Sequence, residues 1–255
     1  QTVKVTLDGQ GADEEMGGYH YFFGFYYKEL LRQFRFLKLI KELKCYWSNH
    51  HSLYGFKSFA YFLLPGWLKT NLRISEKGYL TKDFSTQKFH SIISNELYAS
   101  GDMNTALFNH FEYKLEHLLK WQDLNSMRFS IEARVPFLDY RMVEGLLTID
   151  SDRLISKGMT KTILREAMKG ILPENLRMRK DKVGFDTPQK EWFRTKQFNS
   201  LVTEILSSHS FRDRNIIDVD KANALYKKHL SGTIDISKEI WKWINLELWL
   251  RKNID

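Results

Sequence analysis

The chain has 255 residues, of which 43% are hydrophobic and 27% charged, as expected for a folded globular protein. Its formal charge is +8, but the lysines and arginines are interspersed with acids along helical stretches, so we expect no nucleic-acid binding. No apolar run approaches the roughly 20 residues of a membrane span, so we expect no membrane partner. Cys45 is the single cysteine, which excludes an intrachain disulfide; we expect it to be a small buried residue in a cytoplasmic protein.

The first element is a predicted strand. Residues Val3 to Leu7 are β-branched or apolar at alternate positions and end at Asp8-Gly9, which indicates a buried strand that enters a tight turn. Because the chain opens inside this strand, we expect it to be a piece of a longer polypeptide. From Ala12 onward the pattern is helical almost to the end.

Apolar residues at helical spacing indicate a mainly helical chain. The predicted helices are 21–44, 104–121, 140–148, 160–170, 189–192, 199–207, 219–231 and 236–251. In the last one, Ile240, Trp243, Ile244 and Leu248 share one stripe, and we expect the three tryptophans of this helix to close a core. Residues 46–84 contain Pro65 and several glycines and are predicted to be irregular. The aromatic run GGYHYFFGFYY is interpreted as core rather than as a platform for stacking bases.

The segment LDGQGADEEMGGY, at Leu7 to Tyr19, is the first with residues suited to chemistry. Its glycines allow the backbone to approach a ligand closely, and a strand-to-helix turn directs N–H groups at anions. A carboxylate such as Asp13 can hold Mg²⁺ against a polyphosphate, because this hard cation prefers oxygen ligands. An ordinary turn with an acidic helix N-terminus explains the same residues, and both interpretations stay open at this point.

Two further segments contain charged residues in distinctive settings. In NSMRFSIEARVPFLDYRMVE, Glu132 and Arg134 precede a turn fixed by Pro136; they form either a buried structural pair or a site in which Glu132 faces a cleft and accepts a proton. In the segment from Lys157 to Phe193, Lys161 and Lys182 could neutralise the charge of a leaving pyrophosphate, or they are surface lysines of a basic protein.

Together and in this order, the three segments resemble the synthetase domain of the glutamine-dependent asparagine synthetases and the related β-lactam synthetases. The first matches the family pattern Ser-Gly-Glu-Gly-Ala-Asp-Glu and Phe-Gly-Gly-Tyr, with Asp8 and Gln10 in place of the usual Ser and Glu. The second matches Ser-Met and Glu-Ala-Arg-Val-Pro-Phe-Leu-Asp. The third matches Thr-Lys, Leu-Arg and Lys-x-Gly-Phe at 160–161, 164–165 and 182–185, and Leu-Glu-Leu-Trp at 246–249 is also similar to the family.

The resemblance implies a role for each matching residue. The nucleotide would be lined by the backbone of Asp8, Gly9 and Gly11, and Asp13 would hold the Mg²⁺ bound to the phosphates. Lys161 and Lys182 would contact phosphate or pyrophosphate, with Lys182 stabilising the transition state. Glu132 would assist removal of a proton from the amine. Gln10 is placed with Glu132 and Lys182 among the candidate catalytic residues, although an amide cannot act as a base.

The implied reaction is ATP-dependent amidation of a carboxylate through an acyl-adenylate. The acceptor would be aspartate, with glutamine or ammonia as the nitrogen donor; because Asp8 and Gln10 depart from the family pattern, another acid, for example one from a glycan pathway, is the alternative. A non-catalytic basic helical binding module is a further alternative. The implied ligands are ATP, Mg²⁺, the acceptor acid and ammonia or glutamine.

The implied fold is the mainly α part of an α/β nucleotide-binding domain with a parallel sheet, of the pyrophosphatase-like type. We expect residues 1–255 to be the C-terminal part of one such domain, without the family's N-terminal glutaminase and without its Ser-Gly-Gly-x-Asp-Ser pyrophosphate loop. The chain alone is therefore expected to be inactive. A free sheet edge would favour self-association, for instance as a homodimer.

Overall fold

The computed structural model describes residues 3–87, 96–98, 100–181 and 187–255. In these parts the chain is mainly helical and contains one small parallel sheet, which confirms the predicted fold class. The chain divides into two compact units, one formed by Gln1–Lys69 with Ser91–Lys182 and the other by Thr70–His90 with Val183–Asp255. The expectation that residues 1–255, and so both units, belong to one asparagine-synthetase-type domain stays a prediction. Among the described residues, no helix combines the length and apolarity needed to cross a bilayer.

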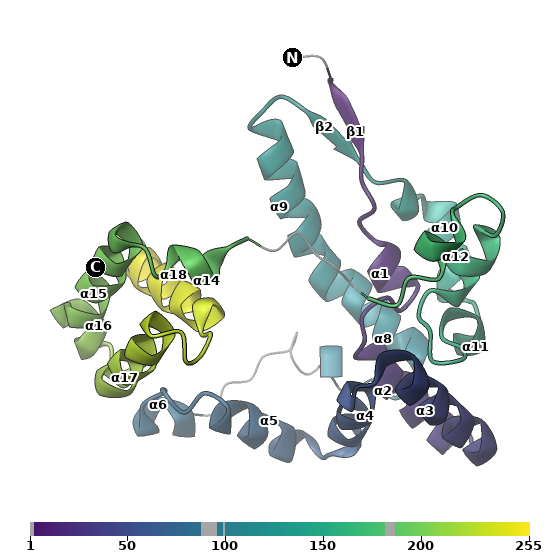
Figure 1. Cartoon of the computed structure of the whole chain (residues 1–255), viewed down its shortest axis with the longest axis horizontal. Helices are drawn as coiled ribbons and strands as arrows, with labels where there is room; N and C mark the ends of the chain where they lie inside the picture. The colour runs from purple at the N-terminus through teal and green to yellow at the C-terminus, as the bar shows by residue number, and fades with distance from the viewer. Residues whose placement is uncertain (1–2, 88–95, 99, 182–186) are drawn as a thin grey trace. The chain divides into compact units, whose positions relative to one another are not determined.

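The sheet consists of two parallel strands, β1 (Val5–Leu7) and β2 (Glu132–Arg134), which lie side by side in Figure 1. In this register Val5 lies opposite Glu132 and Leu7 opposite Arg134. The predicted strand therefore exists, but its predicted burial is wrong, since the side chain of Leu7 is 75% exposed. Parallel strands are usually buried because other elements cover both faces of their sheet. Among the described residues this sheet has only the strands β1 and β2, so it is too small to be covered in that way.

The helices of the first unit begin with α1 (Ala12–Glu15). The single helix predicted over 21–44 is wrong, because the chain forms α2 (Phe22–Arg32) and α3 (Phe36–His50). The break falls at Phe34, whose φ of 57° is left-handed and incompatible with a continuous right-handed helix.

The aromatic run is core, as predicted. Five of its rings, on α2, are completely buried: Phe22, Phe23, Phe25, Tyr26 and Tyr27. Helix α4 (Tyr54–Leu63) packs directly on α2. This close approach requires Gly24, because a Cβ there would lie 2.6 Å from the ring of Phe62 and 2.8 Å from the backbone of Ser58. Cys45 is half-buried rather than buried, and it is unpaired.

The prediction of irregular structure over 46–84 is wrong. Besides α4, this stretch contains α5 (Gly66–Ser75) and begins α6 (Lys82–Thr86). Pro65 starts α5 rather than interrupting a helix, since the N–H of Leu68 donates to its carbonyl. Thr81 caps α6 by accepting from the N–H of Phe84.

The remaining helices of the first unit follow the predicted order. The predicted helix 104–121 is a longer continuous one, made of α8 (Met103–His110), the π-helical turn η1 (Phe111–Leu115) and α9 (Glu116–Met127). Helix α9 packs against β2 (Figure 1). The chain continues through the 3₁₀ turn η2 (Pro136–Leu138), α10 (Tyr140–Leu147), α11 (Ser151–Leu154), α12 (Thr162–Ala167) and α13 (Glu174–Arg177).

The second unit is a helical cluster around a separate apolar core. Besides α6 and the end of α5, which belong to this unit, it comprises α14 (Gln189–Trp192), α15 (Lys196–Ser207), α16 (His209–Asp213), α17 (Val219–Leu230) and α18 (Ser237–Asn253). On α18, Ile240, Trp243 and Ile244 are buried as predicted, but Leu248 is 44% exposed. Of the three tryptophans expected in the core, only Trp243 is buried.

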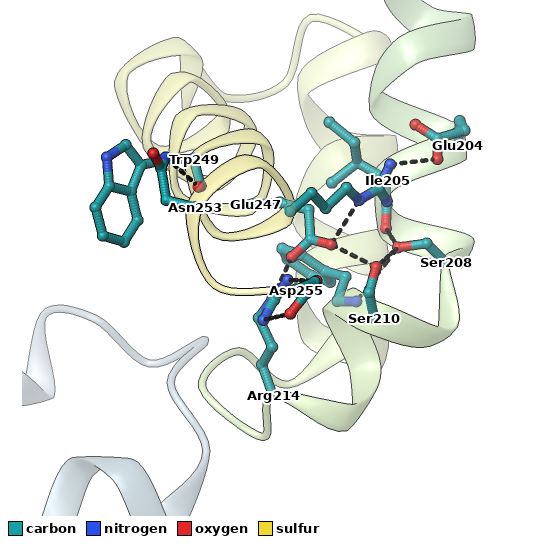
Figure 2. Close-up of polar contacts among 11 residues, drawn as sticks. Glu204, Ile205, Ser208, Ser210, Arg214, Glu247, Trp249, Asn253 and Asp255 are labelled. Atoms are coloured by element: carbon teal, nitrogen blue, oxygen red, sulfur yellow. Dashed lines mark hydrogen bonds and ion pairs between the residues drawn. The ribbon is translucent and has the colours of Figure 1, made fainter.

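The buried stripe of α18 continues at Glu247, which is completely buried. Its carboxylate accepts hydrogen bonds from Arg214 (2.7 Å), Arg251 (2.8 Å) and Ser210 (2.5 Å). Figure 2 shows Glu247 between Arg214 and Ser210. Burial alone would raise the pKa of Glu247, but these donors outweigh it and lower the pKa. Arg214 also binds Asp255 at 2.7 Å, so one guanidinium ties α16 to the end of the chain.

Candidate active site

The turn after β1 contains the first group of predicted site residues. Asp8 closes it, because its carboxylate accepts from the N–H of Gln10 at 3.1 Å. Gly11 has a left-handed φ of 95°, and a Cβ there would lie 2.2 Å from a methyl of Leu138. Gly9 is exposed, and nothing lies within 4 Å of the position that its Cβ would take. The turn is therefore fixed on one side and open to a ligand on the other.

Asp13 and Lys161 form an ion pair of 2.8 Å, although 147 residues separate them in the sequence. Asp13 lies on α1, and Lys161 is the left-handed residue that precedes α12. Gly18 lies directly against the pair, since a Cβ there would be 1.9 Å from an Asp13 carboxylate oxygen and 2.4 Å from Cε of Lys161. The residues predicted to hold a metal and a phosphate are thus brought together, and both side chains are partly exposed.

Glu132 lies on β2, where its carboxylate accepts from Nε of Arg134 at 2.9 Å. Both side chains are exposed, so the pair is not the buried structural device that one interpretation assumed. The hydrogen bond from Arg134 lowers the pKa of Glu132 and keeps the carboxylate ionised at neutral pH. Its assignment as a proton acceptor stays a prediction.

Lys182 lies outside the described residues. The predicted convergence of Asp13, Glu132 and Lys182 on one pocket therefore also stays a prediction. In the sheet register Glu132 lies opposite Val5, whereas Asp8 follows the other end of β1. Asp8 is joined to β2 by its N–H, which donates to the carbonyl of Arg134 at 2.8 Å.

A polar and aromatic network beside this pair was not anticipated from the sequence. Glu14 is buried and accepts from the hydroxyl of Tyr19 at 2.5 Å, while Tyr19 stacks on Tyr21. The ammonium of Lys114 lies 3.7 Å from the centre of the Tyr19 ring and donates to the hydroxyl of Tyr21 at 2.9 Å. Burial, together with Glu14, raises the pKa of Tyr19, so its hydroxyl stays protonated.

Glu15 was also missed. Its side chain is completely buried, and neither carboxylate oxygen has a hydrogen-bond partner in the part of the chain that the structure describes. Burial, and secondly the charge of Glu14, raise the pKa of Glu15 to about 7. The sequence signal for it was its place as the third acid in a row, after Asp13 and Glu14, at the start of the helical pattern.

The donor set suits a magnesium ion only in part. Within the described ranges there is no group of three His, Cys, Asp or Glu side chains that could hold a metal alone. Mg²⁺ that accompanies nucleotides is usually bound by one or two carboxylates, with the phosphates and water as the other ligands. The partly exposed carboxylate of Asp13, next to the cation Lys161, fits that arrangement.

Comparison with known proteins identifies what this chain is similar to. The family model described as asparagine synthase matches residues 1–251. Asparagine synthetase [glutamine-hydrolyzing] 1 of Bacillus subtilis is 27% identical over 99% of this chain and 41% of its own length. A putative asparagine synthetase [glutamine-hydrolyzing] of Mycobacterium bovis is 25% identical over 97% of this chain and 39% of its own length.

Asparagine synthetase [glutamine-hydrolyzing] 3 of B. subtilis is 26% identical over 84% of this chain. The chain thus spans about two fifths of the length of the first of these relatives. No solved structure matches significantly. Because the family match extends over nearly all of its residues, the chain belongs to the asparagine synthase family.

Proposed function

We propose that the full-length protein uses ATP to amidate a carboxylate, with aspartate as acceptor and glutamine or ammonia as nitrogen donor. The observation that carries this proposal is the Asp13–Lys161 pair beside the Gly9–Gly11 turn. An ammonium and a carboxylate at one turn suit a nucleotide polyphosphate with its Mg²⁺. Membership of the asparagine synthase family and the names of the relatives, which are asparagine synthetases, support the same reaction.

In the first step a carboxylate oxygen attacks the α-phosphorus of ATP, and the bond to the β-phosphate oxygen breaks. Pyrophosphate leaves with the bonding electrons, and Lys161 and Lys182 would neutralise its charge. Asp13 would hold the Mg²⁺ that screens the phosphates, and the backbone of Gly9 and Gly11 would line the nucleotide. The product is an acyl-adenylate, in which AMP is a good leaving group.

In the second step the nitrogen of ammonia attacks the acyl carbon, and the bond to the AMP oxygen breaks. The nitrogen must lose a proton, and the ionised carboxylate of Glu132 is proposed to accept it. Gln10 would contact the acceptor through its amide, which can donate and accept hydrogen bonds but cannot act as a base. The family usually has Glu where this chain has Gln10. This difference favours a second candidate function, the amidation of an acid other than aspartate.

The exposed apolar surface beside the sheet supports the proposal that further polypeptide completes the domain. Leu7 on β1 is 75% exposed, and Trp121 and Leu124 on α9 are each 61% exposed. Helix α9 packs against β2, the partner of β1. Apolar side chains exposed on a short strand pair and on the helix that packs against it are usually covered by partner strands or helices. We expect the 255-residue chain alone to self-associate through this surface, as a homodimer, and to be inactive.

The unpaired Cys45 supports a cytoplasmic location.

The test is product analysis with the full-length protein, ATP, MgCl₂, ammonium chloride and a panel of acids. We expect one AMP and one pyrophosphate for each amide formed, with aspartate as the preferred acid. ADP in place of AMP would exclude the acyl-adenylate route. Nucleotide hydrolysis that ignores every acid would exclude amidation itself.

A further inference from the structure

The outward side of helix α3 has no role in the proposed reaction. The helix packs on α2 and α4 (Figure 1), and it buries Leu39 and Tyr46. On the other side Leu37 is 87% exposed, and Ile40 and Trp47 are each about half exposed. Because these three residues lie three and seven positions apart, they form one stripe along the helix. Apolar side chains gathered in this way, unlike single exposed ones, mark a surface that another molecule covers.

Two phenylalanines extend this stripe at the turn that precedes α3. The rings of Phe34 and Phe36 lie edge to face, with centroids 6.0 Å apart. Phe34 ends α2 in a Schellman motif, in which its N–H donates to the carbonyl of Leu31 at 3.1 Å. The next N–H, that of Arg35, donates to the carbonyl of Leu30 at 2.9 Å. Glycine is the usual residue at this left-handed position, because a side chain is disfavoured there. The fold therefore does not require a phenylalanine here, and its ring is 78% exposed.

Two exposed lysines lie beside the apolar stripe. Lys41 follows Leu37 by four positions, and Lys44 follows Ile40 by four, which places both lysines on the same side of the helix. Neither lysine forms an ion pair with a residue that the structure describes. The acid between them, Glu42, is buried and accepts from two backbone N–H groups at 3.0 and 2.9 Å. This side of α3 therefore combines apolar side chains with uncompensated positive charge.

Acids beside the start of α3 are engaged elsewhere. Asp152 binds both Arg35 (2.6 Å) and Lys38 (2.5 Å). Glu29 accepts from a backbone N–H at 2.8 Å, and Asp102 caps α8. The formal charge of the whole chain, +8, also favours an anionic partner.

We propose that this side of α3 binds the surface of an anionic membrane. The surface, called the outer α3 face below, consists of Phe34, Phe36, Leu37, Ile40, Lys41, Lys44 and Trp47. Helices at a membrane surface place Trp, Phe and Leu at the boundary of the acyl chains and lysines among the charged headgroups. The apolar side chains of α3 protrude rather than line a groove, which favours insertion into lipid over docking of a folded protein.

Binding of this kind uses one helix face and needs no membrane span. It revises the expectation that there is no membrane partner, because that expectation considered spanning segments only. The inference goes beyond the proposed amidation and does not depend on it.

The experiment is sedimentation of the full-length protein with lipid vesicles. One set consists of phosphatidylcholine alone, and the other of phosphatidylcholine with an equal amount of phosphatidylglycerol. We expect the wild-type protein to bind the first set at least about tenfold more weakly, because only the second set is anionic. Binding to the second set should weaken when the salt concentration is raised from about 0.1 M to about 0.5 M, since salt screens exposed charges.

Three variants test the two components of the outer α3 face. Lys41→Gln/Lys44→Gln should weaken binding about 25-fold, or roughly fivefold for each lysine. Leu37→Gln should weaken it about fivefold or more, because an apolar side chain no longer enters the lipid. Phe34→Gly should do the same, while the urea midpoint of unfolding stays equal or rises, because glycine suits the left-handed position. This last variant separates loss of binding from loss of folding.

Lys227→Gln/Lys228→Gln and Ile171→Gln are the matched controls, because they make the same changes at exposed residues outside the outer α3 face. They should bind vesicles as the wild type does. The inference is overturned if the wild-type protein binds neither vesicle set, if it binds both equally, or if the three α3 variants bind as tightly as the wild type. A wild-type oligomer that dissociates in Leu37→Gln without lipid, measured by sedimentation velocity, would assign the face to a second copy of the protein and would also overturn it.

Discussion

The buried carboxylate of Glu15 makes the protein less stable as the pH rises, and we predict that Glu15→Gln removes this effect. The side chain is fully buried, and neither oxygen has a partner within the described part of the chain. Burial, and secondly the charge of Glu14, raise the pKa of Glu15 from 4.5 to about 7. The folded protein therefore prefers the protonated acid.

The magnitude follows from these two pKa values. Between pH 4.5 and pH 7 the folded state binds the Glu15 proton more tightly than the unfolded state does. The free energy of unfolding consequently falls as the pH rises through this range, and it levels off above pH 7. At about 1.4 kcal/mol for each pH unit between the two values, the full loss is about 3 kcal/mol.

Urea unfolding at pH 5 and pH 8 measures this difference. Glu15→Gln should gain about 2–3 kcal/mol more over the wild type at pH 8 than at pH 5, because the amide has no charge to bury. Glu144→Gln, which changes an exposed glutamate on α10, serves as the control and should show no such difference. An equal effect of Glu15→Gln at both pH values would contradict the reasoning.

Two other predictions concern the active-site glycine and the second unit. Gly18→Ala should weaken Mg·ATP binding at least about tenfold, because its Cβ would force Asp13 from Lys161; Gly145→Ala, which meets no atom within 4 Å, should bind normally. Arg214→Ala should destabilise the protein by about 3 kcal/mol in urea unfolding, since it leaves the buried Glu247 without a main partner. The stabilising effect of that pair should be complete above the ordinary glutamate pKa and disappear as the pH falls through the lowered one.

The sequence predicted best the helices in which apolar residues recur at regular helical spacing. The predicted helix 189–192 matches α14, and 219–231 differs from α17 by one residue, because apolar spacing and an N-capping Asp218 agree there. The break at Phe34 was not predictable, because both flanking segments keep helical spacing. Residues 46–84 were misjudged because Pro65 was interpreted as a breaker, whereas proline also starts helices.

The site could be predicted only in part, because it depends on contacts between residues that lie far apart in the sequence. The three motifs indicated Asp13 and Lys161 separately, but their 2.8 Å contact depends on how α1 and α12 pack. Glu247 and Glu15 show the same limit in another form. Both acids occupy buried helix positions, yet one has two arginine partners and the other has none among the described residues. A helical pattern predicts which face is buried but not which charges meet there.

The central claim is that Asp13 and Lys161 bind the polyphosphate of ATP for adenylation. Acid-dependent exchange of labelled pyrophosphate into ATP by the full-length protein tests it most directly. Lys161→Ala should lower the exchange rate about a hundredfold or more, the usual effect of losing one preorganised charge at a reacting phosphate, while Lys169→Ala stays near the wild-type rate. Exchange at the wild-type rate in Lys161→Ala would contradict the account.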